Sequence, residues 1–251
     1  MNYAAVDTGS NTIRMSVYDD NLNELYTEAV FANLAGHIES NRLTDEGISV
    51  CCEAILYHRK KAAEYDAKFC VFATAAIRNA DNCDEIVKKV KEKTNIDLEI
   101  LSGSDEGELS FLGAYEDFGV KSGVMADVGG GSSEVIVFND GKIISVQSVP
   151  IGSLKAYKTF VKGEIPTKNE AENIKAEIIK YLDKNPDFKG INTDCLCLVG
   201  GGVRAANKLS VTLLHTESLS VSGVATMLDT FCDDDNSLFL FEKLVPKRKL
   251  T

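Results

Sequence analysis

The sequence has no run of about 18 consecutive apolar residues, the minimum for a helix that crosses a membrane. Its first residues, MNYAAVDTGSN, carry neither the basic n-region nor the apolar h-region of a secretory signal. Acidic residues outnumber basic ones: 38 Asp and Glu against 27 Lys and Arg give a formal net charge of −11. Such a charge opposes non-specific binding to DNA, RNA or an anionic membrane. We therefore expect a cytoplasmic protein that binds neither DNA nor a membrane.

Motifs for several common chemistries are also missing. The three histidines, at positions 37, 58 and 215, have no neighbouring Ser or Cys motif that would complete a nucleophilic triad. We place His58, within the polar stretch YHRKK, on a solvated helix face. Neither a Walker A sequence nor a Gly-x-Gly-x-x-Gly after the first strand is present. These absences argue against nucleophilic triads and nicotinamide chemistry.

Cysteine pairing is not expected, because the seven cysteines are an odd number and several lie in apolar runs such as KFCVFAT. This pattern is typical of reduced core thiols in a cytosolic protein. Cys195 and Cys197 alternate in a strand-like run, so we expect them to point to opposite faces. No second Cys/His pair completes a zinc site.

The composition, 44% hydrophobic and 26% charged over 251 residues, is that of a globular protein with one large domain or two of about 120 residues. The first half predicts an antiparallel meander of strands at 3–7, 12–19 and 24–32. A helix then runs from the N-cap Thr44 to near residue 67. A strand at 68–74, a helix near 84–93, a strand at 97–101 and a helix near 104–118 follow.

After the stretch FGVKSG the same order begins again. Strands are predicted at 123–128, 133–140 and 142–149, then helices near 153–160 and 168–184, a strand at 194–200 and a helix opened by GVRAANKLS. We therefore predict an α/β protein with two similar lobes, residues 1–119 and 120–251, each with a mixed sheet, a three-strand antiparallel meander and packed helices.

Two short loops repeat between matching strands. VDTGSNT (Val6–Thr12) and ADVGGGS (Ala126–Ser132) both read apolar-Asp-x-Gly-x-x-[Ser/Thr], with their aspartates 120 residues apart. Glycine lets the main chain approach a ligand, and successive N–H groups form an anion-binding concavity. Two such loops facing one another would clamp a phosphate chain. The candidate phosphate-binding residues are Gly9, Ser10, Asn11 and Thr12 in the first loop and Gly129, Gly130, Gly131 and Ser132 in the second.

Asp7 and Asp127, one in each loop, would repel a phosphate unless a divalent cation lay between them. Mg²⁺ prefers oxygen ligands and commonly binds through one or two carboxylates plus substrate phosphates. The alternative is that each aspartate caps its own turn, which is common for Asp beside Gly. For the pair we favour phosphate, with Mg²⁺ or another divalent cation as cofactor.

Further stretches add candidate groups for anion binding. LVGGGVRAAN follows a strand and opens a helix, where unpaired N–H groups stabilise anions. This motif contributes Gly200, Gly201 and Gly202. Arg78 lies just past a buried strand in ATAAIRNADN, and it suits either a bidentate phosphate contact or a solvated helix position.

Glu106 is the candidate for acid–base chemistry. An acidic residue at a helix start needs no functional explanation, because the helix dipole favours it. Helical geometry, however, puts Glu106 on one face with Ser110 and Gly113, from which it could look into a cleft. A carboxylate there could activate water.

These motifs together resemble a known family. DTGSNTIRMSVYD, ATAAIRNADN, ILSGSDEGELSFLGAY, DVGGGSSEVIVF, SVPIGSLKAY and LVGGGVRAANKL, in this order, are similar to blocks of the exopolyphosphatase and guanosine pentaphosphate phosphohydrolase family. The resemblance implies the actin, Hsp70 and sugar-kinase superfold, with two ribonuclease-H-like lobes. It also implies a Mg²⁺-dependent hydrolase that cleaves the terminal phosphoanhydride of polyphosphate or pppGpp.

The resemblance also implies roles, position by position. Glu106 matches the base for the attacking water, and Arg78 matches the phosphate-binding arginine. Asp7 and Asp127 match the acidic residues of the two loops, and Glu134 matches the acidic residue just after the second loop, which we assign with them to the metal. Gly129, Gly130, Gly131 and Ser132 match the phosphate cradle.

The sequence departs from the family in three places. Asp105-Glu106-Gly107-Glu108 stands where Glu-Glu-Ala-Arg is usual, and GGGVR, with Arg204, stands where Gly-Gly-Thr is usual. The family normally continues past LVPKRKLT with a further helix, so the end at Thr251 favours a short substrate. Four lysines either replace part of the contacts with substrate that the missing C-terminal segment would make or are solvated; they are Lys155, Lys158, Lys162 and Lys168.

Two other functions stay open at this point. The strand-Gly-Gly-helix of LVGGGVRAAN also suits an ATP-binding phosphotransferase of the same superfold. A non-catalytic sensor that binds a guanosine polyphosphate or polyphosphate fits the shortened chain and Glu108. The expected partners are polyphosphate or a guanosine polyphosphate, and a homodimer is among the assemblies we consider.

Overall fold

The structure is a computed structural model that describes residues 1–215 and 219–232. The chain forms two compact units, residues 1–106 and 107–251, each with its own sheet. The division between the units falls inside helix α4 (Gly103–Phe118), and the sequence-based boundary at residue 119 lies at the end of that helix.

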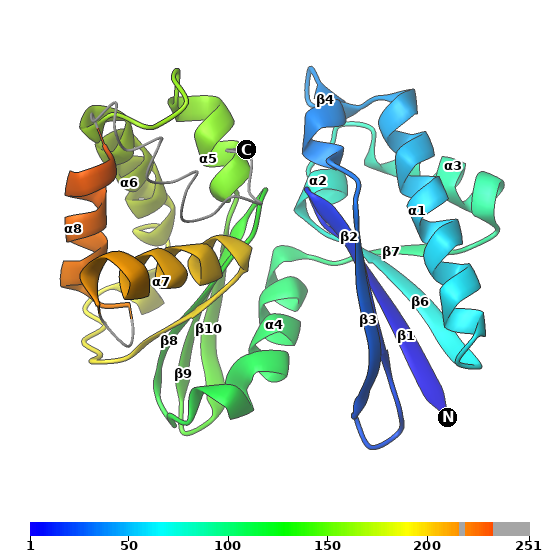
Figure 1. Ribbon diagram of the computed structural model, residues 1–251, viewed down its shortest axis with the longest axis horizontal. Helices are drawn as coiled ribbons and strands as arrows, with labels where there is room; N and C mark the ends of the chain where they lie inside the picture. The colour runs from blue at the N-terminus through cyan, green and yellow to red at the C-terminus, as the bar shows by residue number, and fades with distance from the viewer. Residues whose placement is uncertain (216–218, 233–251) are drawn as a thin grey trace. The chain divides into compact units, whose positions relative to one another are not determined.

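A five-stranded mixed sheet forms the centre of the first unit, in the order β3-β2-β1-β6-β7 (Figure 1). Its strands are β1 (Asn2–Thr8), β2 (Thr12–Tyr18), β3 (Glu24–Phe31), β6 (Ala67–Ala73) and β7 (Leu98–Ile100). The first three form the predicted antiparallel meander, whereas β6 pairs in parallel with β1 and β7. The remaining elements are α1 (Asp45–Ala63), α2 (Ala75–Arg78), α3 (Cys83–Thr94), the 3-10 helix η1 (Leu34–His37) and the short strands β4 (Ile38–Glu39) and β5 (Arg42–Leu43).

The core of the first unit follows from the two hydrophobic periodicities. Alternation along β2 buries Ile13, Met15 and Val17 on one face of the sheet. Residues of α1 at helical spacing, including Ile48 and Ile55, join the same core. Figure 1 shows α1 and α3 on one side of this sheet.

Helix α1 begins where its cap predicts. The Thr44 hydroxyl accepts a hydrogen bond from the Gly47 N–H at 3.2 Å. The helix ends at Ala63 rather than near residue 67, because Asp66 takes a left-handed conformation (φ 49°) and β6 begins at the next residue.

The second unit contains a four-stranded mixed sheet in the order β10-β9-β8-β11. Its strands are β8 (Gly123–Val128), β9 (Ser133–Asn139), β10 (Lys142–Val149) and β11 (Leu196–Val199). The meander β8-β9-β10 is antiparallel and the sheet is mixed, as predicted; the parallel strand is β11, which pairs with β8. The helices besides α4 are α5 (Ser153–Phe160), α6 (Lys168–Leu182), the 3-10 helix η2 (Pro186–Phe188), α7 (Gly201–Leu214) and α8 (Val221–Phe231).

Local signals in the sequence fix two connections of this unit. The β9–β10 turn has positive φ at both Asp140 (49°) and Gly141 (72°), the requirement of a type I′ hairpin. Helix α6 starts with the predicted capping box between Thr167 and Glu170. These elements therefore form where sequence-local chemistry alone places them.

The interpretation of His58 as a solvated residue is wrong. His58 is fully buried, and its Nε2 lies 3.1 Å from the Ile13 carbonyl oxygen. It shares a helix face with the buried residues Cys51, Ile55 and Ala62, which lie seven and three residues before it and four residues after it. Its position on the helix face that packs against the core, rather than its polar neighbours in the sequence, determines its burial.

The expectation that Cys195 and Cys197 face opposite sides is also wrong. Their sulfur atoms lie 3.9 Å apart, because residues two apart on a strand share a face. Burial raises the pKa of the Cys197 thiol to about 11 and that of the Cys51 thiol to about 12. Both thiols are therefore protonated near neutral pH, as suits core positions.

Within the described part of the chain, no helix combines the length and the hydropathy that a bilayer crossing requires.

The second core gives a direct stability prediction. Phe111 is 1% exposed and packs against Phe138 with ring centroids 5.0 Å apart, together with Met125 and Ile136. Phe111→Ala should lower the free energy of unfolding by about 3–5 kcal/mol, as expected for a cavity in a core. The neighbouring Leu112 is 68% exposed, so Leu112→Ala should change it by less than about 0.5 kcal/mol. Urea unfolding of both variants measures the difference, and equal effects would contradict this description of the core.

Candidate active site

The two predicted phosphate loops contain the same turn. In loop 1 (residues 9–12) the Gly9 N–H donates to the Thr12 carbonyl at 3.1 Å, and in loop 2 (residues 129–132) the Gly129 N–H donates to the Ser132 carbonyl at 3.1 Å. A Cβ added to either glycine would lie 3.0 Å from that same carbonyl oxygen. Neither glycine has a positive φ. Glycine is therefore required by the close approach within the turn, not by a left-handed backbone.

The carbonyl groups of loop 1 are held from within the first unit. The Ser10 oxygen accepts from the Ala35 N–H at 2.8 Å. The Asn11 oxygen accepts from the N–H groups of Ala32 (3.1 Å) and Asn33 (2.8 Å). A trans peptide points its C=O and its N–H in opposite directions. Because the Ser10 carbonyl points toward the Ala35 N–H, the N–H of the same peptide, that of Asn11, points away from Ala35.

Loop 2 is held in the same way by the start of α5. The Gly129 oxygen accepts from the Ser153 N–H at 2.9 Å, and the Gly130 oxygen accepts from the N–H groups of Leu154 and Lys155, both at 3.0 Å. Donors that a helix N-terminus normally leaves unpaired are thus used to orient the loop. The peptide geometry then aims the N–H groups of Gly130 and Gly131 away from α5.

The loop amides remain available as donors. Among the described residues, no hydrogen bond uses the backbone N–H of Ser10, Asn11, Gly130 or Gly131. Ser10 and Ser132, whose hydroxyls we expected to contact phosphate, are only 7% and 2% exposed. The main-chain N–H groups, rather than these hydroxyls, are therefore the groups of both loops that are free to donate to an anion.

The third glycine motif lies beside loop 2. Gly200 has a φ of 118°, and a Cβ there would lie 2.4 Å from the Val128 carbonyl oxygen. Because β11 and β8 are parallel, their carboxyl ends share one edge of the sheet. The second unit thus brings Gly200, the N-cap of α7, next to Val128, the residue that precedes loop 2, and Gly201 and Gly202 follow in the first turn of α7.

Two carboxylates of the second unit are cross-strand neighbours. Asp127 on β8 lies directly opposite Glu134 on β9, so both side chains are on one face. The Ser110 hydroxyl donates to Asp127 Oδ2 at 2.5 Å, and the Ser148 hydroxyl donates to Glu134 Oε1 at 2.9 Å. Glu134 is 1% exposed. Each acid is therefore oriented by a serine from a neighbouring element.

Gly107 has a packing role that explains one departure from the family sequence. A Cβ at this position would lie 2.7 Å from Val146 Cγ1 and 3.4 Å from Glu134 Cβ. The residue after Glu106 therefore lies so close to Val146 on β10 that a side chain there would require Val146 to shift.

In the first unit, Arg78 and Glu106 form an ion pair. Arg78 Nη1 donates to Glu106 Oε2 at 2.6 Å and to the Leu101 carbonyl at 3.0 Å. The two side chains are only 15% and 21% exposed, so solvent screens this pair less than a surface pair. Arg78 follows β6 and Glu106 follows β7, and these parallel strands end at one edge of the sheet.

Asp7 lies at the same edge of the first unit. It occupies the penultimate position of β1, two residues before Gly9 of loop 1, and its Oδ2 lies 3.8 Å from the Cβ position of Gly9. The first unit therefore brings together Asp7, loop 1, Arg78 and Glu106 at the carboxyl ends of three neighbouring strands.

The carboxylates fit the donor set of a hard divalent cation. Asp7, Asp127 and Glu134 offer acceptor oxygens, and serine hydroxyls orient two of them. In the described segments, no group of three or more His, Cys, Asp or Glu side chains is close enough to hold an ion. A Mg²⁺ ion needs only one or two carboxylates when phosphate supplies further oxygens, so the residues fit a metal that binds with its substrate.

Three residues of the site were not assigned from the sequence: Ser148, Gly152 and, as a partner of Asp127, Ser110. Each contact joins residues 14 or more positions apart, across a sheet or between a helix and a loop. Only the tertiary structure pairs them, although the motif SVPIGSLKAY contains both Ser148 and Gly152.

Comparison with known proteins identifies a family. A model of the Ppx/GppA phosphatase family matches residues 30–233. The bifunctional 3-dehydroquinate synthase/phosphatase of Fusobacterium nucleatum is 27% identical over 98% of this chain and 40% of its own length. Exopolyphosphatase 1 of Mycobacterium tuberculosis is 28% identical over 66% of this chain and 51% of its own length. The chain thus spans about half or less of these relatives.

Solved structures share the fold. An exopolyphosphatase from Cytophaga hutchinsonii superposes with a TM-score of 0.75 at 20% identity, covering 92% of this chain and 79% of that one. A Ppx/GppA family member from Aquifex aeolicus gives 0.71 at 23% identity, covering 92% and 78%. The predicted two-lobed actin-like fold class is therefore confirmed.

Gly152 provides a test of how loop 2 is held. A Cβ there would lie 2.5 Å from the Gly130 carbonyl carbon and 2.7 Å from the Gly129 oxygen, both backbone atoms. Gly152→Ala should therefore cost about 1–3 kcal/mol of unfolding free energy through overpacking. Gly202 has nothing within 4 Å of its Cβ position, so Gly202→Ala is the matched control and should not destabilise. Thermal unfolding that ranks the two variants equally would contradict the observed packing of loop 2.

Proposed function

Because the chain belongs to the Ppx/GppA phosphatase family, we propose that it hydrolyses the terminal phosphoanhydride bond of inorganic polyphosphate or of guanosine pentaphosphate. The observation that carries the proposal is the repeated loop, in which captured carbonyls leave consecutive main-chain N–H groups as anion donors. The name of the mycobacterial relative, exopolyphosphatase 1, supports the first substrate. A Photobacterium profundum relative, 26% identical over 70% of this chain, is named guanosine-5'-triphosphate,3'-diphosphate pyrophosphatase and supports the second.

In this proposal the amide donors of each loop bind phosphate oxygens of the substrate. The amides of loop 1 and loop 2 donate to phosphate oxygens, and the start of α7 adds the favourable end of a helix dipole. Asp7, Asp127 and Glu134 are the residues that would hold Mg²⁺, which when bound neutralises phosphate charge and stabilises the leaving oxygen. Ser110 and Ser148 keep two of these acids in the correct rotamer.

Hydrolysis assigns different tasks to the two partners of the ion pair. Phosphate oxygens compete with Glu106 for the Arg78 guanidinium, because arginine binds carboxylate and phosphate oxygens alike. Once Arg78 engages the terminal phosphoryl group, Glu106 can accept a proton from water. The water oxygen bonds to the terminal phosphorus while the bridging P–O bond breaks, and the shortened chain leaves with the bond's electron pair.

Glu106→Gln tests the base. The amide cannot accept the proton, so phosphate release from tripolyphosphate with Mg²⁺ should fall by about 10²–10⁴-fold. The affinity for tripolyphosphate, measured by calorimetry, should be retained. Glu108 is exposed two positions later on α4, and Glu108→Gln should leave turnover unchanged. Full activity of the Glu106→Gln variant would remove Glu106 from the mechanism.

Metal removal is an independent test. EDTA should abolish phosphate release, and excess Mg²⁺ should restore it, because the acids beside the loops otherwise repel the substrate. Asp127→Asn should raise the Mg²⁺ concentration needed for half-maximal rate. Release that is insensitive to EDTA would contradict the assigned role of these carboxylates.

A further inference from the structure

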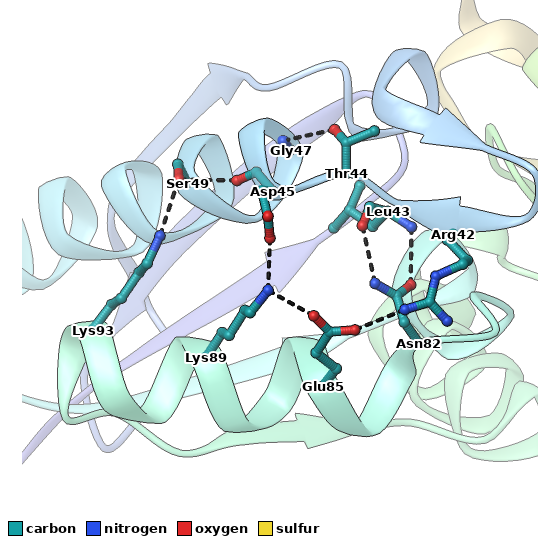
Figure 2. Close-up of polar contacts among 10 residues, drawn as sticks. All are labelled: Arg42, Leu43, Thr44, Asp45, Gly47, Ser49, Asn82, Glu85, Lys89 and Lys93. Atoms are coloured by element: carbon teal, nitrogen blue, oxygen red, sulfur yellow. Dashed lines mark hydrogen bonds and ion pairs between the residues drawn. The ribbon is translucent and has the colours of Figure 1, made fainter.

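Arg78 belongs to a segment that a separate hairpin holds in place. The link between Arg78 and α3 contacts the β4–β5 hairpin, and Figure 2 shows the Asn82 side chain bonded to Leu43 of β5. The Asn82 side chain accepts from the Leu43 N–H at 2.9 Å and donates to the Leu43 carbonyl at 3.0 Å. Asn82 is 6% exposed, so these two bonds are shielded from water.

The side chain of Asn82 is not used for its usual local purpose. Asn82 occupies the N-cap position of α3, where asparagine normally accepts a hydrogen bond from a backbone N–H of the first turn. No such cap is formed. The amide bonds both backbone groups of one residue on β5 instead, and this reciprocal pair fixes both its position and its orientation.

A second contact holds the same link. The Asn41 side chain donates to Asp81 Oδ1 at 2.6 Å, and the Asn41 carbonyl accepts from the Asp81 N–H at 2.9 Å. Ser40 and Asn41 both have positive φ, 45° and 60°, which makes the β4–β5 turn tight. Figure 2 also shows an ion pair between Arg42 and Glu85 at 2.8 Å, which is exposed.

We propose that Asn82 is a positioning residue for Arg78, an inference that rests on the proposed function. Hydrogen bonds to the Leu101 carbonyl and the Glu106 carboxylate orient the Arg78 guanidinium. The backbone of Arg78 is positioned by α2 and by the hydrogen bonds between Asn82 and Leu43. A bidentate contact with phosphate demands accurate geometry, so a small displacement of this link moves the arginine away from the phosphate.

The test is a double-mutant cycle on the full chain with Mg²⁺ and tripolyphosphate, read by calorimetry. Asn82→Ala should weaken binding by roughly tenfold or more, the effect of a lost charged contact. In an Arg78→Ala background, Asn82→Ala should cause no further loss. Arg42→Gln, which removes the exposed ion pair at the same junction, is the matched control and should change the affinity by less than about twofold.

Independent losses from Asn82→Ala and Arg78→Ala, or no loss from Asn82→Ala, would overturn the proposal. If Asn82→Ala does not fold, Asn82→Asp retains the acceptor for the Leu43 N–H and should give a smaller loss that also vanishes in the Arg78→Ala background. A loss that persists there would overturn the proposal as well.

A readout without substrate separates this inference from the proposed function. If the wild-type chain neither binds nor hydrolyses tripolyphosphate, the function fails, and ¹⁵N NMR of the Arg78 guanidinium decides the positioning role. The signals of the Arg78–Glu106 ion pair should change in Asn82→Ala and persist in Arg42→Gln. Unchanged signals in Asn82→Ala would show that Asn82 does not position Arg78.

Discussion

The capture of loop carbonyl oxygens by backbone N–H groups is the interaction on which the candidate site depends. In loop 1 the donors come from the segment around η1, and in loop 2 they come from the first turn of α5. A planar peptide that has its C=O fixed has its N–H fixed in the opposite direction. The fold therefore orients these N–H groups before any ligand binds, an arrangement that would lower the entropic cost of the proposed phosphate binding.

The two loops share one glycine requirement. Gly9 and Gly129 meet the same constraint, a carbonyl oxygen 3.0 Å from their Cβ positions. Loop 1 completes the turn with Ser10 and Asn11, so the turn itself does not require the second and third glycines of loop 2. Gly130 lies within 2.7 Å of the Cβ position of Gly152, which shows how closely α5 approaches the loop. Loop 2 is thus fixed by direct contact between its backbone and the backbone at the start of α5.

Much of the fold could be predicted from the sequence because its signals are local. Strand alternation, the Thr44 cap, the Thr167 capping box and the Asp140-Gly141 turn each depend on residues within a few positions. The β4–β5 hairpin and the four-residue α2 were not predicted, since two-residue strands and single turns carry no periodicity. Helix α8 was missed, although the Ser220 cap at its start is a local signal. In the site, the identities of the acids and the arginine followed from motifs and family resemblance. The Arg78–Glu106 pair and the serine partners of the acids required the tertiary structure.

Backbone amide shifts test the central claim, that the loops are two preoriented donors for one phosphate chain. Tripolyphosphate with Mg²⁺ would be titrated into ¹⁵N-labelled protein while the amide signals of Ser10, Asn11, Gly130 and Gly131 are followed. The account predicts that all four signals shift downfield and saturate at one ligand concentration, as N–H groups that donate to a common anion should. Shifts confined to one loop, different saturation points for the two loops, or no shift in either would contradict it.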